Sequence, residues 1–301
     1  MISFSPQDKT PLAVQAYLQA AIGPRPICFA STINARGEVN LSPFSFFNIF
    51  GTNPVTLIFS PARRVRDNTI KHTLENVREV DEVVINVVNF AMVQQTSLSS
   101  TEYARGVDEF VKSGFTKIAS DTIKPPRVKE SPVQLECKVK QIVETGDGGG
   151  AGNLVICEVQ KIHVSEDILN EAGMIDQHKI DLVGRLGANW YVRASGDALF
   201  EVTKPLTTLG IGVDALPEPI RNSPVLTGNS LGRLGNVEKL PDAAELNDFE
   251  ASGRFAELAA EFGLTQGEMM VQAHPLAQQL LNSERVEEAW LLLLLSLKNN
   301  A

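Results

Sequence analysis

Residues 133–164 constrain the fold more than any other part of this sequence. Residues 133–139 alternate between apolar and polar side chains, the period of two that is typical of a strand with one buried face. A glycine-rich run at residues 146–152 leads into residues 153–164, which again favour a strand. The pattern predicts a long antiparallel hairpin, because phosphate-binding glycine loops carry a lysine and lead into a helix instead.

Further strands are predicted on the N-terminal side of this hairpin. They are residues 26–33, 38–50, 54–59 and 82–88, with turn-forming residues such as Asn53 and Pro54 between the first ones. Residues 67–80 instead place apolar side chains at helical spacing, and Asp67, Asn68 and Thr69 are types that cap helices. Strands with few long helices between them favour an antiparallel barrel over a doubly wound sheet.

The organisation of the chain changes near residue 200. Residues 205–242 are rich in Gly, Pro and Asn, which predicts loops or short strands, and a helical pattern follows from Asp242. We therefore expect a first domain over residues 1–200 and an extension over residues 201–301 that is loop-rich and then helical. The last predicted helix, residues 284–298, is apolar on nearly every side, so we expect it to dock on the barrel or on a partner subunit.

Composition excludes several classes of protein. The formal net charge is -9, from 27 basic and 36 acidic side chains, which disfavours a nucleic-acid binder. The three cysteines form no CxxC pair, Cys28 lies in an apolar strand and is expected in the core, and the four histidines lack ligand spacing. We therefore expect no metal site. No apolar run approaches the ~20 residues of a membrane helix, and no signal peptide is apparent, so we expect a cytoplasmic protein without a membrane partner.

One basic segment stands out in this acidic chain. Arg63, Arg64, Arg66 and Lys71 lie within nine residues, directly after a predicted strand and at the start of a predicted helix. Helix N-termini bind phosphate well, because free N–H groups and the helix dipole add to the charge of nearby cations. A solvated run of charges at a helix start is the alternative interpretation, and the residues alone leave both open.

A second unusual segment is aromatic. Residues 42–48 contain three of the 14 phenylalanines, interleaved with small polar residues. Core packing is the ordinary interpretation. The segment is also suited to lining a flat aromatic ligand whose polar edge would meet Ser45, Asn48 or the nearby backbone.

Taken together, these segments resemble the flavin reductase-like family of FMN-binding split barrels. The matching residues are 26–32, Gly37, 40–48, 53–54, 71–77, 108–110, 126–128, 130–133 and 135–137. The family usually has an acidic residue between the Lys and Thr that match Lys71 and Thr73, and this chain has His72 there. Residues 206–214 and 226–229 resemble an extension found in a longer branch of the family.

The resemblance implies a mainly β fold, an antiparallel Greek-key split β-barrel with peripheral helices and a C-terminal loop-plus-helix extension. It also implies a homodimer with one FMN per subunit near the dimer interface. Thr32, Ser60, Arg63 and Lys71 would hold the phosphate, with His72 and Thr73 beside them. The backbone of Ser45, Phe46, Phe47 and Asn48 would meet the edge of the isoalloxazine ring.

The function that the resemblance implies is an FMN-dependent oxidoreductase, a flavin reductase-like enzyme. It would pass hydride or electrons between NADH or NADPH and a flavin or a downstream acceptor. The flavin carries this chemistry, so no dedicated acid–base pair is required. Two alternatives stay open: an FMN-carrying electron-transfer protein without nicotinamide turnover, and a cofactor-free split-barrel binding module.

Overall fold

The structure is a computed structural model that describes residues 1–202, 204–205 and 207–300. The chain forms two compact units, Met1–Phe200 (unit 1) and Glu201–Ala301 (unit 2). Leu206, the first residue of the segment that resembles the family extension, lies outside the described residues. In the described part of the chain, every helix is too short or too polar to cross a membrane.

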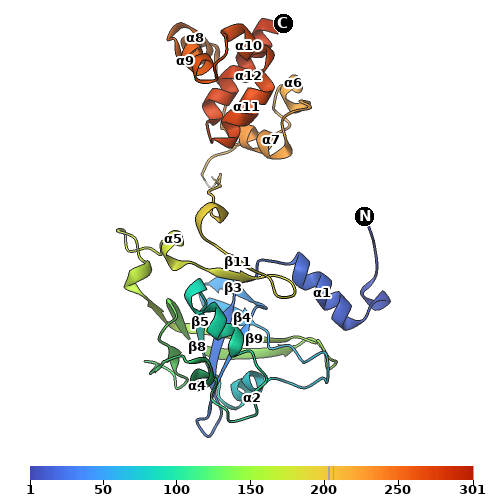
Figure 1. The fold of residues 1–301 in the computed structure, drawn as a ribbon, viewed down its shortest axis with the longest axis vertical. Helices are drawn as coiled ribbons and strands as arrows, with labels where there is room; N and C mark the ends of the chain where they lie inside the picture. The colour runs from blue at the N-terminus through green and yellow to red at the C-terminus, as the bar shows by residue number, and fades with distance from the viewer. Residues whose placement is uncertain (203, 206, 301) are drawn as a thin grey trace. The chain divides into compact units, whose positions relative to one another are not determined.

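Unit 1 is built on a seven-stranded antiparallel sheet (Figure 1). Its strands are β1 (Cys28–Ile33), β2 (Val39–Phe44), β3 (Phe47–Thr52), β4 (Val55–Phe59), β5 (Glu82–Val87), β8 (Val133–Glu144) and β9 (Asn153–Val164). Their order across the sheet is β2-β1-β5-β8-β9-β4-β3, which leaves β2 and β3 at the two edges. The predicted split barrel with peripheral helices is confirmed.

The predicted long hairpin is the centre of this sheet. β8 and β9 pair from Val133 opposite Val164 to Glu144 opposite Asn153, with two register shifts between these ends. The strand therefore continues beyond residue 139, where the strict alternation stops. Among the described residues, β8 pairs beyond residue 139 with β9 alone, and the pairing of β9 to β4 holds this end of the hairpin in the sheet.

The interior of the barrel contains all three cysteines. Cys28, Cys137 and Cys157 are 0% exposed and belong to one apolar cluster with Phe59 and Leu74. Burial raises the pKa of each thiol, to about 12 for Cys157, so all three are protonated. The prediction that Cys28 is a core residue is confirmed.

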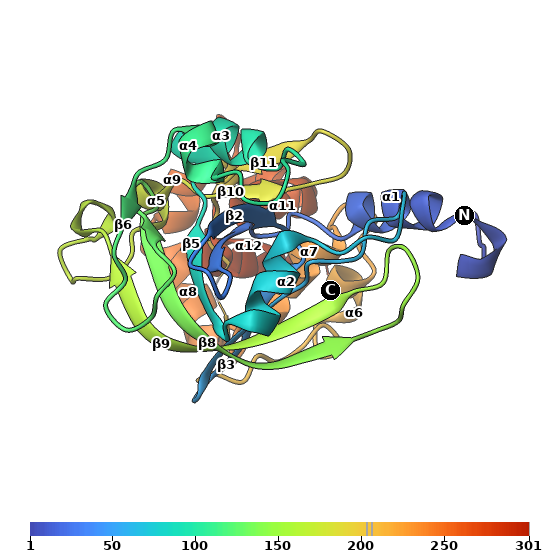
Figure 2. The same ribbon diagram turned by 90° about the horizontal axis from the view of Figure 1, so that it is seen from below.

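Smaller elements surround the barrel (Figure 2). They are the 3-10 helices η1 (Pro6–Asp8), η2 (Phe90–Met92), η3 (Glu166–Ile168) and η4 (Gly196–Ala198), the helices α1 (Pro11–Ala21), α2 (His72–Glu79), α3 (Val93–Leu98), α4 (Glu109–Ser113) and α5 (Gln177–Ile180), and two small sheets, β6 (Lys117–Ile118) with β7 (Arg127–Val128) and β10 (Val183–Arg185) with β11 (Tyr191–Arg193). α1 has no buried residue, whereas α2 buries Leu74 and Val77 against the barrel.

The start of α2 differs from the sequence prediction. The helix begins at His72, so Asp67, Asn68 and Thr69 precede it and do not cap it. Asn68 has a φ of 56°, in the left-handed region, which a right-handed helix does not accept. Asp67 Oδ1 instead accepts hydrogen bonds from the Thr69 backbone and hydroxyl, a local turn that competes with helix formation.

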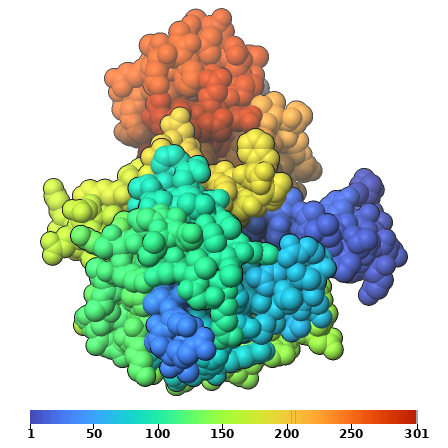
Figure 3. Space-filling view, turned by 60° about the horizontal axis from the view of Figure 1, so that its bottom comes forward, coloured from blue at the N-terminus to red at the C-terminus, as the bar shows by residue number. Residues whose placement is uncertain are grey.

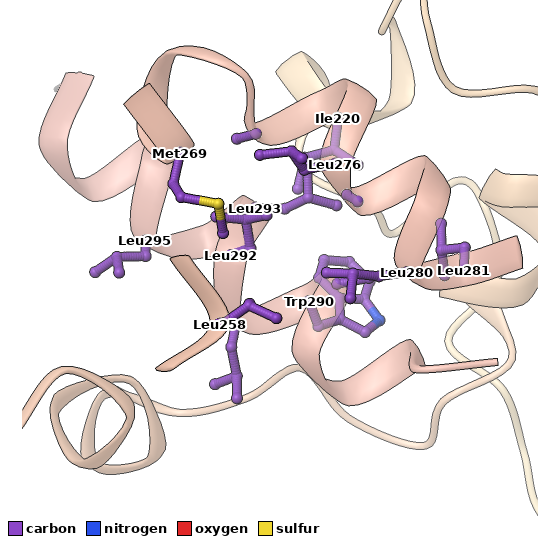
Figure 4. Packing of buried hydrophobic residues seen from close by; sticks show 14 of the residues in the cluster. Ile220, Leu258, Met269, Leu276, Leu280, Leu281, Trp290, Leu292, Leu293 and Leu295 are labelled. Atoms are coloured by element: carbon purple, nitrogen blue, oxygen red, sulfur yellow. The ribbon is translucent and has the colours of Figure 1, made fainter. Parts of the chain in front are cut away.

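Unit 2 is helical and has its own core (Figure 4). Its helices are α6 (Glu218–Arg221), α7 (Gly228–Gly235), α8 (Ala243–Ala251), α9 (Arg254–Glu261), α10 (Gln266–Val271), α11 (Ala273–Asn282) and α12 (Val286–Asn300). The predicted loops at residues 205–242 thus include two helices. α7 forms because Thr227 caps it and because Leu231 and Leu234 reach the core, which outweighs its glycines.

The last helix is buried as predicted, but the residues that cover it differ from the predicted ones. Trp290, Leu292 and Leu293 of α12 are at most 1% exposed and pack in one cluster with Leu276 and Leu280 of α11. The expectation that this helix needs the barrel or a partner subunit as cover is therefore wrong. The helices of unit 2 itself supply the apolar surface that the leucines require.

Candidate functional site

Backbone hydrogen bonds bring three segments together around residues 60–71. The Ser60 N–H donates to the Phe46 carbonyl over 2.8 Å, which ties the basic loop to the aromatic segment. The Arg63 N–H donates to the Ala151 carbonyl over 2.9 Å, and the Gly150 N–H donates to the Arg63 carbonyl over 3.1 Å. The glycine-rich tip is therefore a hairpin turn, as predicted, that also holds the basic loop in place.

Lys71 is the cation in this loop that lacks a partner. It is the N-cap residue of α2, and no side chain caps the helix. Its Nζ lies 5.8 Å from the centre of the Phe44 ring, and among the described residues it makes no hydrogen bond or ion pair. Burial lowers the pKa of Lys71 and the nearby charge of Arg64 lowers it further, whereas the charge of Glu102 acts in the opposite direction.

The N-terminus of α2 adds free donors beside this cation. The N–H groups of Leu74 and Glu75 donate to the Lys71 carbonyl, at 2.9 and 3.2 Å. In the described part of the chain, the N–H groups of His72 and Thr73 have no such acceptor. A partly buried ammonium and two free N–H groups at a helix start together favour an anionic ligand.

The neighbouring arginines are already engaged within the loop. Arg63 Nε donates to Asn68 Oδ1 over 2.6 Å, and its Nη2 donates to the Asn68 carbonyl over 2.8 Å. Arg64 pairs with Glu102 at 3.0 Å, and Arg66 pairs with Glu102 at 2.9 Å. These arginines shape the loop, so the solvated-charge interpretation describes Arg66, whose side chain is 71% exposed, but not Lys71.

Two residues that sequence reasoning did not place in the site support Thr73. The Thr73 hydroxyl donates to Asn40 Oδ1 over 2.7 Å, and Asn40 Nδ2 donates to Glu109 Oε1 over 2.9 Å. Burial raises the pKa of Glu109, against the opposing effect of the Leu41 N–H that it accepts. Asn40 and Glu109 appeared in the sequence only within segments that resemble the family.

A small cavity joins these groups. It has a volume of about 30 Å³, and its lining includes Ser42, Lys71, His72 and Thr73 as well as the carboxylates of Glu102 and Glu109. His72 thus lies at the same cavity as the two residues that flank it in the sequence. The structure brings together this part of the predicted phosphate site.

The other predicted phosphate contacts are placed differently. Thr32 is 0% exposed, and its hydroxyl accepts a hydrogen bond from Asn76 Nδ2 over 3.1 Å inside the unit. Ser60 is 8% exposed, and its Oγ accepts from the Asn153 N–H over 3.1 Å. Both side chains organise the walls of the site in this structure, and their direct contact with a ligand stays a prediction.

The predicted ring-contacting segment lies at the edge of the sheet. Phe47 and Asn48 pair with Phe59 and Ile58 of β4, and among the described residues no strand pairs with the other side of β3. Its outward backbone groups are therefore available to the edge of a ligand. The four side chains differ: Ser45 Oγ accepts from Arg25 Nε over 3.3 Å, Phe46 is 41% exposed, Phe47 packs against the barrel core, and Asn48 is exposed.

Gly149 allows the glycine-rich tip to approach the basic loop, which leads to a prediction. A Cβ at this position would lie 3.0 Å from the Val65 carbonyl oxygen and 3.1 Å from that of Arg64. We expect Gly149→Ala to displace the loop, to cost about 1 kcal/mol of stability and to weaken binding of an anionic ligand at Lys71 a few-fold. Urea unfolding and ligand titration measure these effects.

Gly148 provides the matched control for this substitution. A Cβ there meets no atom within 4 Å, so Gly148→Ala keeps the loop in place. Equal effects of the two substitutions would show that the tip does not position the loop.

A second cluster of ionisable groups contains Asp121, Glu136 and His163. One ligand-type atom of each lies within 4.8 Å of the others. Lys161 already pairs with Asp121 at 2.5 Å, and Arg127 Nε lies 3.8 Å from Glu136, so these cations balance the carboxylates. We interpret the cluster as an ion-pair network rather than a metal centre.

The pKa of Glu136 predicts how this cluster responds to acid. Burial by itself would raise the pKa, but hydrogen bonds from Thr122, Asp121 and His163 lower it from 4.5 to about 2. The resulting stabilisation is present above about pH 4.5 and is lost as the pH falls towards 2. We expect Glu136→Gln to reduce the fall in melting temperature over this window, whereas Glu171→Gln, an exposed control, leaves it unchanged.

Comparisons with known proteins identify relatives of this chain. A protein of Aquifex aeolicus, described as uncharacterised, is 36% identical over 179 residues, which are 60% of this chain and 89% of that protein. Nitrilotriacetate monooxygenase component B from Bacillus cereus is 27% identical, with a TM-score of 0.62 over 67% of this chain and 98% of that chain. A 2-nitrobenzoate 2-nitroreductase from Pseudomonas fluorescens, 24% identical with a TM-score of 0.61, covers 70% of this chain and 100% of its own, and shows the shared fold.

The family itself follows from the extent of one further match. The model of the flavin reductase like domain matches residues 22–181, which include the aromatic segment, the basic loop and α2. Unit 2 lies outside this match. The resemblance seen in the sequence, the split barrel and this match lead to one conclusion: the chain belongs to the flavin reductase-like family.

Proposed function

We propose that this protein is an FMN-dependent oxidoreductase that takes electrons from NADH or NADPH and passes them to a flavin or a downstream acceptor. The observation that carries the proposal is Lys71, a partly buried cation without a partner at the uncapped start of α2. A phosphate group would satisfy both the ammonium and the free N–H groups beside it. Family membership and the monooxygenase component among the structural neighbours support redox chemistry.

The residues present fit an FMN molecule. Lys71 and the N–H groups of His72 and Thr73 would hold the phosphate, and Arg63 would act by keeping the loop in shape through Asn68. The open backbone edge of β3 would bond the polar edge of the ring. A bound flavin would supply the redox chemistry, accepting hydride at its N5 atom.

The protein's own contribution is position and desolvation. The Asn40 amide holds the Thr73 hydroxyl, which fixes the first turn of α2. Arg25 holds Ser45 and so orients the start of the aromatic segment. The Phe44 ring, 5.8 Å from the Lys71 Nζ and 5.4 Å from the Phe59 ring, would shield one side of the ammonium from water.

Two measurements test the proposal. Flavin titration of the flavin-free protein should give tighter binding of FMN than of riboflavin, because the two differ by the phosphate. NADH and NADPH oxidation is then followed with and without added free flavin. Equal affinity for FMN and riboflavin contradicts the phosphate site, and FMN binding without nicotinamide oxidation favours an electron-transfer protein instead.

We also propose that the protein is a homodimer. Ile49 and Phe50 on the edge strand β3 are 55% and 64% exposed, and Leu12 and Ile22 flank or lie on α1 with 65% and 62% exposed. Figure 3 shows the N-terminal segment, in dark blue, standing out from the rest of unit 1. Large apolar side chains exposed on an edge strand are typical of an interaction surface, so a second copy is a suitable cover.

The oligomeric state is a direct prediction. Light scattering at micromolar concentration should give about twice the chain mass of 32.7 kDa. Phe50→Asp should shift the equilibrium towards the monomer, because it places a charge in the apolar surface. Val111→Asp, at a more exposed site (76%) outside β3 and α1, is the control. A monomer at every concentration would contradict the proposal.

A further inference from the structure

A second hollow in unit 1 lies between α3 and the β10–β11 hairpin. Its volume is about 390 Å³, and residues of η2, α3, β10 and β11 line it. In Figure 2, α3 lies beside β10 and β11. This size suits one part of a small-molecule ligand. We call it the hairpin groove.

The walls of the hairpin groove combine aromatic rings with arginines. The Arg185 guanidinium lies 4.6 Å from the centre of the Tyr191 ring, and that of Arg193 lies 3.9 Å from the centre of the Phe90 ring. Stacked guanidinium and aromatic planes offer flat surfaces to a planar ring and N–H donors to an anion. The groove is therefore built for a ligand that carries both.

The positive charge of Arg185 is not balanced by an acid. Its N–H groups donate to the carbonyls of Leu186, Ala188 and Trp190. These hydrogen bonds, which we call the hairpin staple, hold the turn of the hairpin in place. Among the described residues it has no carboxylate partner, whereas Arg193 is paired with Asp181 at 2.7 Å. A bound anion would supply the missing negative charge.

Arg25 adds a second unbalanced charge close by. It is 8% exposed and donates to the carbonyls of Gln19, Ile22 and Leu186 and to Ser45 Oγ. Its guanidinium has no carboxylate partner in the described chain. Burial lowers the pKa of Arg25, and the charge of Arg185 lowers it further. The pair makes the region electropositive in an acidic protein.

The same contacts link the hairpin groove to the proposed flavin segment. The backbones of Arg25 and Arg185 exchange two hydrogen bonds, at 3.0 and 2.8 Å, and Arg25 Nε lies 3.3 Å from Ser45 Oγ. Ser45 begins the segment that would meet the isoalloxazine edge. A ligand in the groove would thus lie next to the residues that position the flavin.

We propose that the hairpin groove binds the phosphate-bearing adenosine part of the dinucleotide electron donor. This inference rests on the proposed function, because it assigns a place to the donor of that reaction. The adenine ring would stack on the aromatic walls, and the phosphates would pair with Arg185. An aromatic carboxylate also combines a planar ring with a negative charge, so it is the alternative ligand for this groove.

The test uses the full-length protein, flavin-free and loaded with FMN, and two probes, ADP-ribose and benzoate. Binding is measured by calorimetry. Arg185→Gln removes the charge but keeps an amide donor for the turn, and Gln94→Glu adds a near-isosteric charge to the groove wall without touching the hairpin staple. Gln141→Glu makes the same change at an exposed position of β8 that does not line the groove, and serves as the control.

We expect ADP-ribose to bind the wild-type protein saturably, with affinity lowered about tenfold by Arg185→Gln and by Gln94→Glu and unchanged by Gln141→Glu. The KM for NADH should rise by a similar factor while the FMN affinity stays constant. If Arg185→Gln disturbs the hairpin, the difference in ADP-ribose affinity between the Gln94→Glu and Gln141→Glu proteins still tests the proposal.

Three results would overturn the inference: no ADP-ribose binding, equal binding by the Gln94→Glu and Gln141→Glu proteins, or binding of benzoate only. FMN titration of the same samples separates the two proposals. FMN binding without ADP-ribose binding contradicts the proposed role of the hairpin groove and leaves the proposed function in place. ADP-ribose binding with the expected variant pattern but without FMN binding supports the groove and contradicts the flavin site.

Discussion

Replacing Lys71 by Met should weaken FMN binding by about 1.5–3 kcal/mol, the range for hydrogen bonds to charged groups. Among the described residues Lys71 makes no ion pair, and Glu102, whose charge acts on it, is already paired with Arg64 and Arg66, so a phosphate would be its counter-charge. The substitution keeps the length of the side chain and its contact with Phe44. Fluorescence titration of the flavin-free protein measures the dissociation constant.

Several comparisons make this experiment specific. Riboflavin affinity should change little, because riboflavin lacks the phosphate. Lys140→Met removes an exposed lysine that pairs with Glu158, and FMN affinity should stay as in the wild type. The stability of the flavin-free protein should hardly fall, since Lys71 makes no ion pair that the substitution would break. Unchanged FMN affinity in Lys71→Met would show that Lys71 does not bind the phosphate and would support the solvated-charge interpretation.

Replacing Trp290 by Ala should destabilise unit 2 by about 3–5 kcal/mol, the usual cost of truncating a buried Trp. The side chain is 1% exposed, and its Nε1 donates to the Leu234 carbonyl over 3.1 Å. Figure 4 shows the ring among Leu280, Leu281 and Leu258. The substitution therefore leaves a cavity and an unpaired buried carbonyl. Thermal unfolding followed by circular dichroism measures the loss.

FMN affinity should remain at the wild-type value in Trp290→Ala, because every candidate cofactor residue lies in unit 1. Val271→Ala, at a position that is 88% exposed, is the control and should leave stability within about 0.5 kcal/mol. Truncation after Asn282 removes all of α12 and should have a still larger effect on unit 2. Full stability of the truncated chain would show that α12 is not part of this core.

Local patterns predicted most of the barrel. The alternation at residues 133–139 and the glycine-rich tip specified the β8–β9 hairpin, because a period of two and a turn signal are properties of neighbouring residues. The same holds for the burial of Cys28 and of the apolar last helix. The family resemblance added the candidate site before any geometry was known.

The roles of the individual cations depended on tertiary structure. Arg63, Arg64, Arg66 and Lys71 are alike in the sequence, and Lys71 alone has no partner among the described residues because Asn68, Asp67 and Glu102 engage the others. The start of α2 also shifted, since the turn at Asp67–Thr69 competes with the helix.

The sequence by itself determined most of the strands and the last helix, because those choices rest on contacts between near neighbours, but it did not place the start of α2 or the helices α6 and α7. Contacts between distant residues decided the rest. Asn40 meets Thr73 across 33 positions of the chain, and Glu109 meets Asn40 across 69. Arg25 meets Arg185 in the same way, and α12 finds its cover inside unit 2. The tertiary fold decides which distant residues become neighbours. A charged residue or an apolar helix face therefore has a defined role only once its partner lies beside it.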